Sequence, residues 1–212
     1  MIALITVVGL FSLFSIWSIN RAWLAGTAET AELQELSSAS LDAQVSFKVQ
    51  VQEWKNILLR GREQERVVKH LASFRANDAE TADYLDRVSS QARQMGLDQE
   101  ANTALSLRDA HKALSERYEA ALASAMDGGA ELSPAKAYEI DVALRGVDRK
   151  LENDIGQLAI GIAQRSKERS VRLATEMQER YRTLRWFIIG VILLSLLITG
   201  YVVSGALRAT RA

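Results

Sequence analysis

The sequence contains no cysteine, and this absence excludes several kinds of protein. Disulfides, thiol catalysis and cysteine metal sites all require that residue, whereas an exported domain that is stable without disulfides does not. The two histidines, His70 and His111, are too few for most metal centres. The chain also has no phosphate-binding loop or nucleophile elbow. We therefore expect no enzyme, no cofactor and no metal site.

Proline is scarce as well, with Pro134 the only one among 212 residues. Proline breaks helices, and a composition rich in Ala, Leu, Glu, Gln and Arg is typical of helical proteins. The sequence therefore predicts an all-α fold. Neither sign of charge is in excess, because 26 Lys and Arg residues balance 26 Asp and Glu residues. This balance gives no reason to expect binding to nucleic acid.

Two long uncharged runs lie near the ends of the chain, at residues 2–19 and 186–207. A membrane-spanning helix needs about 20 apolar residues, so each run is long enough to cross a bilayer. A signal peptide is the alternative for the first run, but it would have a basic start and a shorter apolar core. Aromatic residues typical of membrane interfaces lie near the ends of these runs: Trp17, Trp23, Trp186 and Tyr201. We expect two transmembrane helices.

The orientation in the membrane is harder to predict than the spans. Arg208 and Arg211, in the short tail at 208–212, favour a cytoplasmic C-terminus by the positive-inside rule. Arg180, Arg182 and Arg185 crowd the other flank of the second run and oppose this. Large domains cross membranes largely regardless of charge, so the rule decides little here.

The central region, residues 20–185, divides into four amphipathic segments at about 20–60, 63–95, 99–126 and 134–185. In each segment, inward-facing residues recur at steps of three and four, as on one face of a helix. These residues are Leu36, Ser40, Ala43, Phe47, Val51, Trp54 and Leu58; Val67, Leu71, Phe74, Asp78, Thr81, Leu85, Val88, Ala92 and Met95; Ala104, Leu107, His111, Leu114, Tyr118, Ala121 and Ala125; and Ile140, Leu144, Val147, Leu151, Ile155, Leu158 and Ile162. Four such helices can bury these faces only against one another, which predicts an antiparallel four-helix bundle flanked by the two spans.

Glycines mark the expected loops, at Gly61, Gly96 and Gly128. The first and last of these loops are expected at the end of the bundle far from the membrane, and Gly96 near the membrane. Ser133 caps the fourth helix, and Pro134 occupies its first turn. That helix is expected to be unbroken, so its water-exposed part would be about 75 Å long at about 1.5 Å per residue.

Three segments of the chain resemble a known family. Residues 43–61, Ala-Gln-Val-Ser-Phe-Lys-Val-Gln-Val-Gln-Glu-Trp-Lys-Asn-Ile-Leu-Leu-Arg-Gly, are similar to the end of the first sensor helix of proteobacterial methyl-accepting chemotaxis proteins. Gly96, followed by Leu107, His111, Leu114 and residues 118–122, resembles their third helix. Residues 145–149, Arg-Gly-Val-Asp-Arg, resemble a short motif of the fourth. Three matches in this order, between two spans, are far more specific than any one of them, and with the spans the resemblance extends over nearly the whole chain.

This resemblance implies a two-pass protein of the bacterial inner membrane with a periplasmic sensor domain. Such receptors work as homodimers, bind a small molecule or a ligand-loaded periplasmic binding protein, and pass a movement of the last helix through the membrane. Family members continue into a HAMP linker and a cytoplasmic signalling coiled coil. Because this sequence ends at Ala212, we expect either a truncated receptor or a stand-alone protein that pairs with full-length chemoreceptors.

The strongest candidates for ligand binding are Arg145 and Arg149, which are four residues apart and would share a helix face. Arginine can hold a carboxylate or similar anion through two hydrogen bonds. The alternative is ion pairing within the bundle and solvation. His111 is a further candidate, with a buried, hydrogen-bonded core histidine as the more frequent alternative; a pH-linked response is conceivable because its pKa is near neutral.

Four other candidates are Trp54, Lys55 and Arg60 on the first helix and Tyr118 on the third. Trp54 and Tyr118 also fit core packing, and the two cations also fit a solvated surface. Two functions follow as hypotheses. One is a sensor whose bundle binds a small ligand; the other is a membrane-anchored scaffold that pairs with full-length receptors and binds no small molecule.

Overall fold

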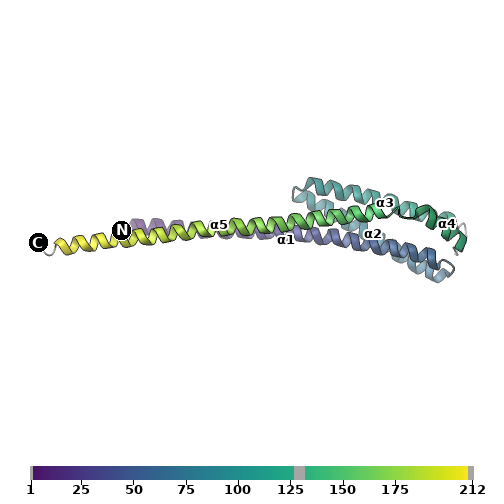
Figure 1. Ribbon diagram of the computed structural model, residues 1–212, viewed down its shortest axis with the longest axis horizontal. Coiled ribbons are helices and arrows are strands. Elements are labelled where there is room, and N and C mark those ends of the chain that lie inside the picture. Colours follow the sequence, from purple (N-terminus) through teal and green to yellow (C-terminus); the bar gives the residue numbers. More distant parts are fainter. Residues whose placement is uncertain (1, 127–131, 210–212) are drawn as a thin grey trace. The chain divides into compact units, whose positions relative to one another are not determined.

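The computed structural model describes residues 2–126 and 132–209, with side chains described outside 2–8, 10–12, 202 and 205–209. These residues form five α-helices and include no strand. The helices are α1 (Ile2–Arg60), α2 (Gln64–Gln94), α3 (Asp98–Met126), α4 (Pro134–Leu144) and α5 (Arg149–Ala209), as labelled in Figure 1. The predicted all-α class is confirmed.

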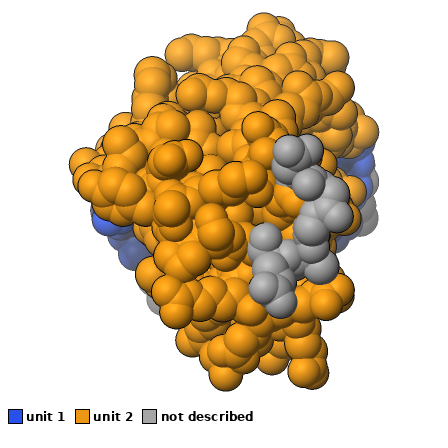
Figure 2. All heavy atoms as spheres, turned by 90° about the vertical axis from the view of Figure 1, so that its right-hand side faces the viewer, with its two compact units in different colours: residues 1–31, 167–212 blue, residues 32–166 orange. Residues whose placement is uncertain are grey.

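The chain forms two compact units, coloured separately in Figure 2. Unit 1 comprises residues 1–31 and 167–212, from the first part of α1 and the last part of α5. Unit 2 comprises residues 32–166 and contains all of α2, α3 and α4. The candidate site described below lies entirely within unit 2.

Unit 2 is built around one hydrophobic core to which all five helices contribute. Its largest fully buried side chains include Phe47 of α1, Phe74 of α2, Tyr118 of α3 and Ile155 of α5. Most of the inward positions expected from the sequence are buried. Ile57 of α1, which lies outside the expected stripe, is also fully buried.

The turns of unit 2 follow the expected chemistry. Gly96 has φ 72°, a left-handed conformation that glycine adopts without steric cost, and it directly follows Met95, the C-cap residue of α2. The Leu97 amide donates to the Ala92 carbonyl at 2.8 Å, which completes this cap. At the start of α4, the Ser133 hydroxyl accepts a hydrogen bond from the Lys136 amide, as predicted. The expected Gly128 loop lies outside the described residues.

Gly61 ends α1, as predicted, and it also brings two segments of unit 2 together. A Cβ atom on Gly61 would lie 2.7 Å from Cβ of Leu132, which is closer than two carbon atoms can approach. The Leu132 amide donates to the Gly61 carbonyl at 2.9 Å. Only glycine permits this contact, so the end of α1 is fixed against the residue that precedes α4.

The predicted fourth helix is wrong in one respect, because it is broken at residues 145–148. Arg145 has an extended backbone, with φ −61° and ψ 117°, and Gly146 has φ 76°. These angles interrupt the helical hydrogen bonds, which start again when the Glu152 amide donates to the Asp148 carbonyl at 2.9 Å. The unbroken rod from Pro134 therefore does not exist: Arg145 lies in the break, and Arg149 is the first residue of α5.

In unit 1, α1 and α5 contact each other through a small residue and an ion pair. A Cβ on Gly26 would lie 2.5 Å from Cδ1 of Leu173, so the leucine occupies the space above the glycine. One turn away, the Arg169 guanidinium donates to both carboxylate oxygens of Glu29, at 2.9 and 2.7 Å. These two contacts fix the register of α1 against α5 within this unit.

One described helix, at residues 149–201 within α5, is long and apolar enough to cross a membrane. Its apolar window has a mean hydropathy of 2.0 and is not buried against the rest of the protein. The predicted span at 186–207 lies at the C-terminal end of α5. The predicted span at 2–19 lies largely outside the described side chains, and the whole tail at 208–212 does so as well.

Candidate functional site

A small cavity of about 110 Å³ lies in unit 2 at the break between α4 and α5. Ten residues from α1, α3, α4, α5 and the break line it: Val51, Trp54, Lys55, Tyr118, Asp141, Leu144, Arg145, Gly146, Asp148 and Arg149. Four of these ten lie in the break or directly after it, because α4 ends at Leu144 and α5 begins at Arg149. The break therefore shapes the cavity.

Stacked aromatic rings form the floor of this cavity. The rings of Trp54 and Tyr118 lie 4.4 Å apart between centroids, with 22° between their planes. Phe74 approaches both rings, with centroid distances of 6.1 Å to each. Because all three side chains are buried, the floor of the cavity belongs to the hydrophobic core and is held rigidly.

The lining of the cavity carries charges of both signs. Lys55, Arg145 and Arg149 are cations, while Asp141 and Asp148 are carboxylates, which leaves an excess of one positive charge. Arg145 donates to Asp141 one turn back on α4 at 2.7 Å, and this hydrogen bond raises the pKa of Arg145. Arg149 lies on the other side of the break, with its Nε 3.3 Å from the position that a Cβ on Gly146 would take.

Burial also affects the phenol of Tyr118. Removal from water raises the pKa of Tyr118 above its ordinary value, and the nearby Asp148 carboxylate raises it further. The hydroxyl is therefore neutral at any physiological pH. It can serve the cavity as a neutral polar group.

The structure brings five of the seven predicted site residues to this one cavity. They are Trp54, Lys55, Tyr118, Arg145 and Arg149. Arg60 is the last residue of α1 and does not line it, and neither does His111.

The sequence analysis did not single out Val51, Asp141, Leu144, Gly146 or Asp148 as site residues. A glycine followed two residues later by aspartate signals a helix end and a new helix start. This pattern at Gly146 and Asp148 could have revealed the break. It would also have placed both residues beside the two arginines.

His111 belongs instead to a buried polar cluster formed by α1, α2 and α3. Its Nε2 lies 2.8 Å from Oε1 of Gln50 and 3.3 Å from Oδ1 of Asp78. The side-chain amide nitrogen of Gln50 donates to Asp78 at 2.8 Å and to the Ser115 hydroxyl at 2.9 Å. That hydroxyl in turn donates to Asp78. Burial lowers the pKa of His111 below 6.5, Asp78 opposes this shift and Arg108 adds to it. The histidine is therefore a core residue with hydrogen-bond partners.

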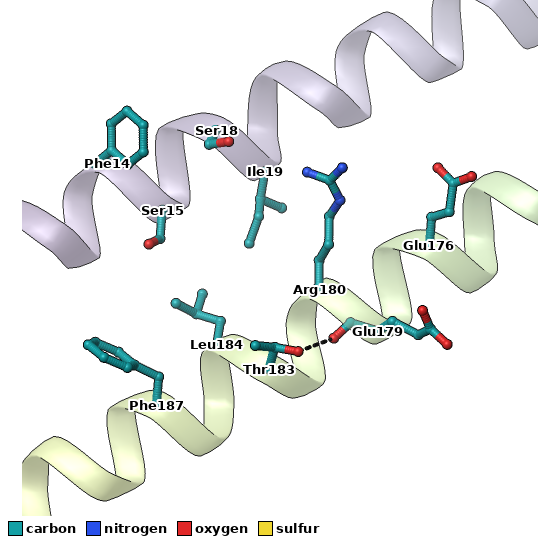
Figure 3. Close-up of a pocket in the computed structure, with 10 residues that line it drawn as sticks. All are labelled: Phe14, Ser15, Ser18, Ile19, Glu176, Glu179, Arg180, Thr183, Leu184 and Phe187. Atoms are coloured by element: carbon teal, nitrogen blue, oxygen red, sulfur yellow. Dashed lines mark hydrogen bonds between the residues drawn. The ribbon is translucent and has the colours of Figure 1, made fainter.

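A larger groove of about 610 Å³ lies in unit 1 between α1 and α5. Figure 3 shows Ile19 of α1 and Leu184 of α5 directed into it from opposite sides. Its ionisable lining residues are Glu176, Glu179 and Arg180. None of the predicted site residues lies here, and carboxylates outnumber the cation. The smaller cavity of unit 2 therefore remains the candidate site.

Comparison with known proteins finds similarity to a chemotaxis receptor. The chain is 31% identical over 135 residues to the methyl-accepting chemotaxis protein CtpH of Pseudomonas aeruginosa. The match covers 64% of this chain and 22% of the length of that relative. No protein-family model and no solved structure matches. The resemblance to chemotaxis receptors that the sequence motifs indicated is confirmed by this match.

Proposed function

We propose that the chain is the sensor part of a chemoreceptor-like membrane protein, with unit 2 as an antiparallel four-helix bundle that binds a small anion. In this proposal residues 2–19 and 186–207 span the bacterial inner membrane, and the region between them is periplasmic. α5 transmits the bound state through the membrane. The similarity to a chemotaxis receptor supports the general role. The observation that carries the ligand site is the convergence of Lys55, Arg145 and Arg149 on one cavity.

The charges and the size of the cavity favour a small anion over other ligands. Guanidinium groups hold carboxylates and similar oxyanions through paired hydrogen bonds. Arg145 lies in the break and is held to α4 by Asp141, whereas Arg149 begins α5, so the two arginines reach the cavity from the two ends of the break and both can contact one ligand. A volume of about 110 Å³ leaves room for only a few non-hydrogen atoms, given that a water molecule occupies about 30 Å³ in the liquid.

Ligand-dependent thermal stabilisation of the full chain in detergent tests this site. Inorganic phosphate, acetate and malonate are added at constant ionic strength, with tetramethylammonium as a cationic comparison. A ligand that binds only the folded protein raises its stability in proportion to RT ln(1 + [L]/Kd). We expect at least one anion to raise the melting temperature. Lys55→Ala, Arg145→Ala and Arg149→Ala should each weaken that shift.

A matched control is available in Arg75, which pairs with Glu119 on another face of unit 2. The pair Arg75–Glu119 and the pair Arg145–Asp141 have the same side-chain exposures, 61% and 48%. Arg75→Ala therefore removes an equivalent surface ion pair without touching the cavity. If Arg75→Ala and Arg145→Ala weaken the anion effect equally, or if no anion stabilises the chain, the proposed site is wrong.

The proposed topology has its own test, since the natural chain contains no cysteine. Leu59, 82% exposed, lies near the end of α1 that is proposed to be far from the membrane. A Leu59→Cys variant should react with a membrane-impermeant maleimide in spheroplasts, while Ala212→Cys should react only after lysis. The opposite labelling pattern would place unit 2 in the cytoplasm.

An exposed apolar stripe on α1 supports a paired protein, either a homodimer or a complex with full-length chemoreceptors. Leu41, Val45 and Val49 follow each other at steps of four and are 47%, 60% and 40% exposed. Residues at this spacing share a helix face, and such a face is typical of a helix that packs against a partner. The second candidate function is a scaffold that pairs through this stripe and binds no small molecule. Two results together would favour it: no anion stabilises the chain, and full-length receptors copurify with it.

A further inference from the structure

We infer that the break at residues 145–148 is a hinge, and that a ligand in the cavity moves α5 relative to α4 by bridging Arg145 and Arg149. This inference rests on the proposed anion site, which it extends from binding to transmission. Its starting point is a coincidence of position: Arg145, Gly146, Asp148 and Arg149 both form the junction of the two helices and line the cavity.

The two arginines are attached to different bodies. Arg145 is held to α4 by its hydrogen bond to Asp141 at 2.7 Å. Arg149 is the first residue of α5 and lies across the turn, beside Gly146. An anion that both guanidinium groups contact would therefore link α4 to α5 across the break. A ligand shifts a conformational equilibrium only if it binds one arrangement more tightly than the other, and an anion that needs both guanidinium groups would bind best where the two lie closest together.

The aromatic floor of the cavity is held more firmly than the turn. Trp54 and Tyr118 are stacked and belong to the closely packed core. The backbone of the turn, in contrast, is held by long hydrogen bonds, from the Val147 amide to Leu144 and from the Arg149 amide to Gly146, both at 3.3 Å. We therefore place the movement in the turn and not in the floor of the cavity.

The turn also has unfilled space on its other side. A groove of about 290 Å³ lies between α3 and the start of α5, and Val147 and Leu151 form one wall of it. Ala110 and Ala113 of α3 lie along this groove and are exposed. Movement of a packed segment requires space, because overpacking is destabilising. The groove permits the turn to shift without displacing core residues.

Spin labels placed on both sides of the break test the hinge in the full chain in nanodiscs. Glu139→Cys on α4 and Asn153→Cys on α5 are exposed positions 14 residues apart. The control pair, Ser106→Cys and Ala120→Cys, has the same separation within the unbroken helix α3. Interspin distances are measured by pulsed electron paramagnetic resonance with and without inorganic phosphate, and calorimetry on the same samples measures phosphate binding.

The hinge predicts a broader distance distribution across the break than within α3, already without phosphate. On binding, the mean distance across the break should shift by about 1–2 Å, the size of typical helix shifts, while the control distance stays constant. Ala113→Leu, which fills the groove beneath Val147, should retain phosphate binding and lose this shift.

Bound phosphate with no change in distance would overturn the hinge and leave the proposed binding site intact. Absence of phosphate binding would count against the anion site. In that case the ligand-free distributions still decide the hinge, because a distribution across the break as narrow as that of α3 would overturn it.

Discussion

The indole of Trp54 stacks on the phenol of Tyr118, 4.4 Å away, and this contact joins the wall of a cavity to the core of a helical unit. Both rings line the candidate site, yet only 5% of Trp54 and 2% of Tyr118 is exposed. The two interpretations that the sequence left open for these residues, core packing and ligand contact, are therefore compatible. Structural and binding effects of mutations must be separated at these positions.

Replacement of Trp54 by alanine is expected to lower the free energy of unfolding by about 3–5 kcal/mol, the range for a buried large aromatic residue. The loss arises from the empty volume and from the lost contacts with Tyr118 and Phe74. Urea unfolding of the full chain in mild detergent, followed by circular dichroism, measures it. Leu59→Ala on the same helix is the control and should change stability by less than about 0.5 kcal/mol because Leu59 is exposed. Equal effects of the two variants would contradict the assignment of Trp54 to the core.

The buried cluster around His111 makes stability depend on pH in a defined direction. Burial lowers the pKa of His111 in the folded state below 6.5, so the unfolded chain binds the proton more tightly. The stabilising contribution of neutral His111 to the free energy of unfolding is therefore fully present above pH 6.5. It is lost as the pH drops toward the lowered pKa, by at most about 1.4 kcal/mol per pH unit.

Unfolding free energies of the natural chain and of His111→Gln between pH 5 and 7 test this effect. The variant keeps a polar side chain toward Gln50 and Asp78 but cannot titrate, so its stability should depend less on pH. The difference between the two slopes isolates His111 from Arg108, from the Asp78 carboxylate and from His70, which both proteins contain. Parallel slopes for the two proteins would show that His111 does not take up a proton in this range.

The helices and their inner faces could be predicted because the spacing of apolar residues determines which side of a helix is buried. Phe47 on α1, and Phe74 and Leu85 on α2, each lie on the apolar face predicted for their own helix and are fully buried, as that spacing requires. The break at Gly146 could not be read from the same pattern. Leu144, Val147 and Leu151 keep the three-and-four spacing across it, so periodicity alone predicts one continuous helix.

The candidate site was predictable in its residue types more than in its geometry. Arginine and lysine close to one another in a predicted bundle indicate an anion site, whichever helix carries them. Asp141 was missed because a carboxylate on a helix surface has no distinctive spacing. Asp148 was missed because the continuous three-and-four spacing was given more weight than the turn signal at Gly146 and Asp148. The turn brings both carboxylates to the same cavity as Arg145 and Arg149.

The close contact of Gly26 with Leu173 in unit 1 predicts coupling between substitutions at these two positions. In a helix, Gly→Ala normally stabilises by about 1 kcal/mol because alanine restricts the unfolded chain. At Gly26 the new Cβ would lie 2.5 Å from Cδ1 of Leu173, so the leucine must move and the gain should be lost. In a Leu173→Ala background the gain should reappear.

Thermal unfolding of the four variants of this cycle measures the coupling. Gly161→Ala is the matched control, because a Cβ added to Gly161 of α5 would meet no neighbouring side chain within 4 Å, and this change should stabilise the chain in either background. If Gly26→Ala stabilises the natural chain as much as Gly161→Ala does, α1 and α5 do not approach closely at this point.

The apolar stripe on α1 predicts a specific cross-link between two copies of the chain. If two copies pair through Leu41, Val45 and Val49, the residues at the centre of the stripe lie opposite their own counterparts, because a two-fold axis brings the same surface of each copy together. Val45→Cys should then form a disulfide-linked dimer on mild oxidation in membranes. The control is Ser106→Cys on α3, which is also exposed. Because the natural chain has no cysteine, each variant carries a single one, and the Ser106→Cys variant should remain monomeric. Equal cross-linking of the two variants would indicate random collision. A Val45→Cys product that forms only when full-length chemoreceptors carrying a cysteine are present would assign the stripe to a different partner and favour the scaffold function.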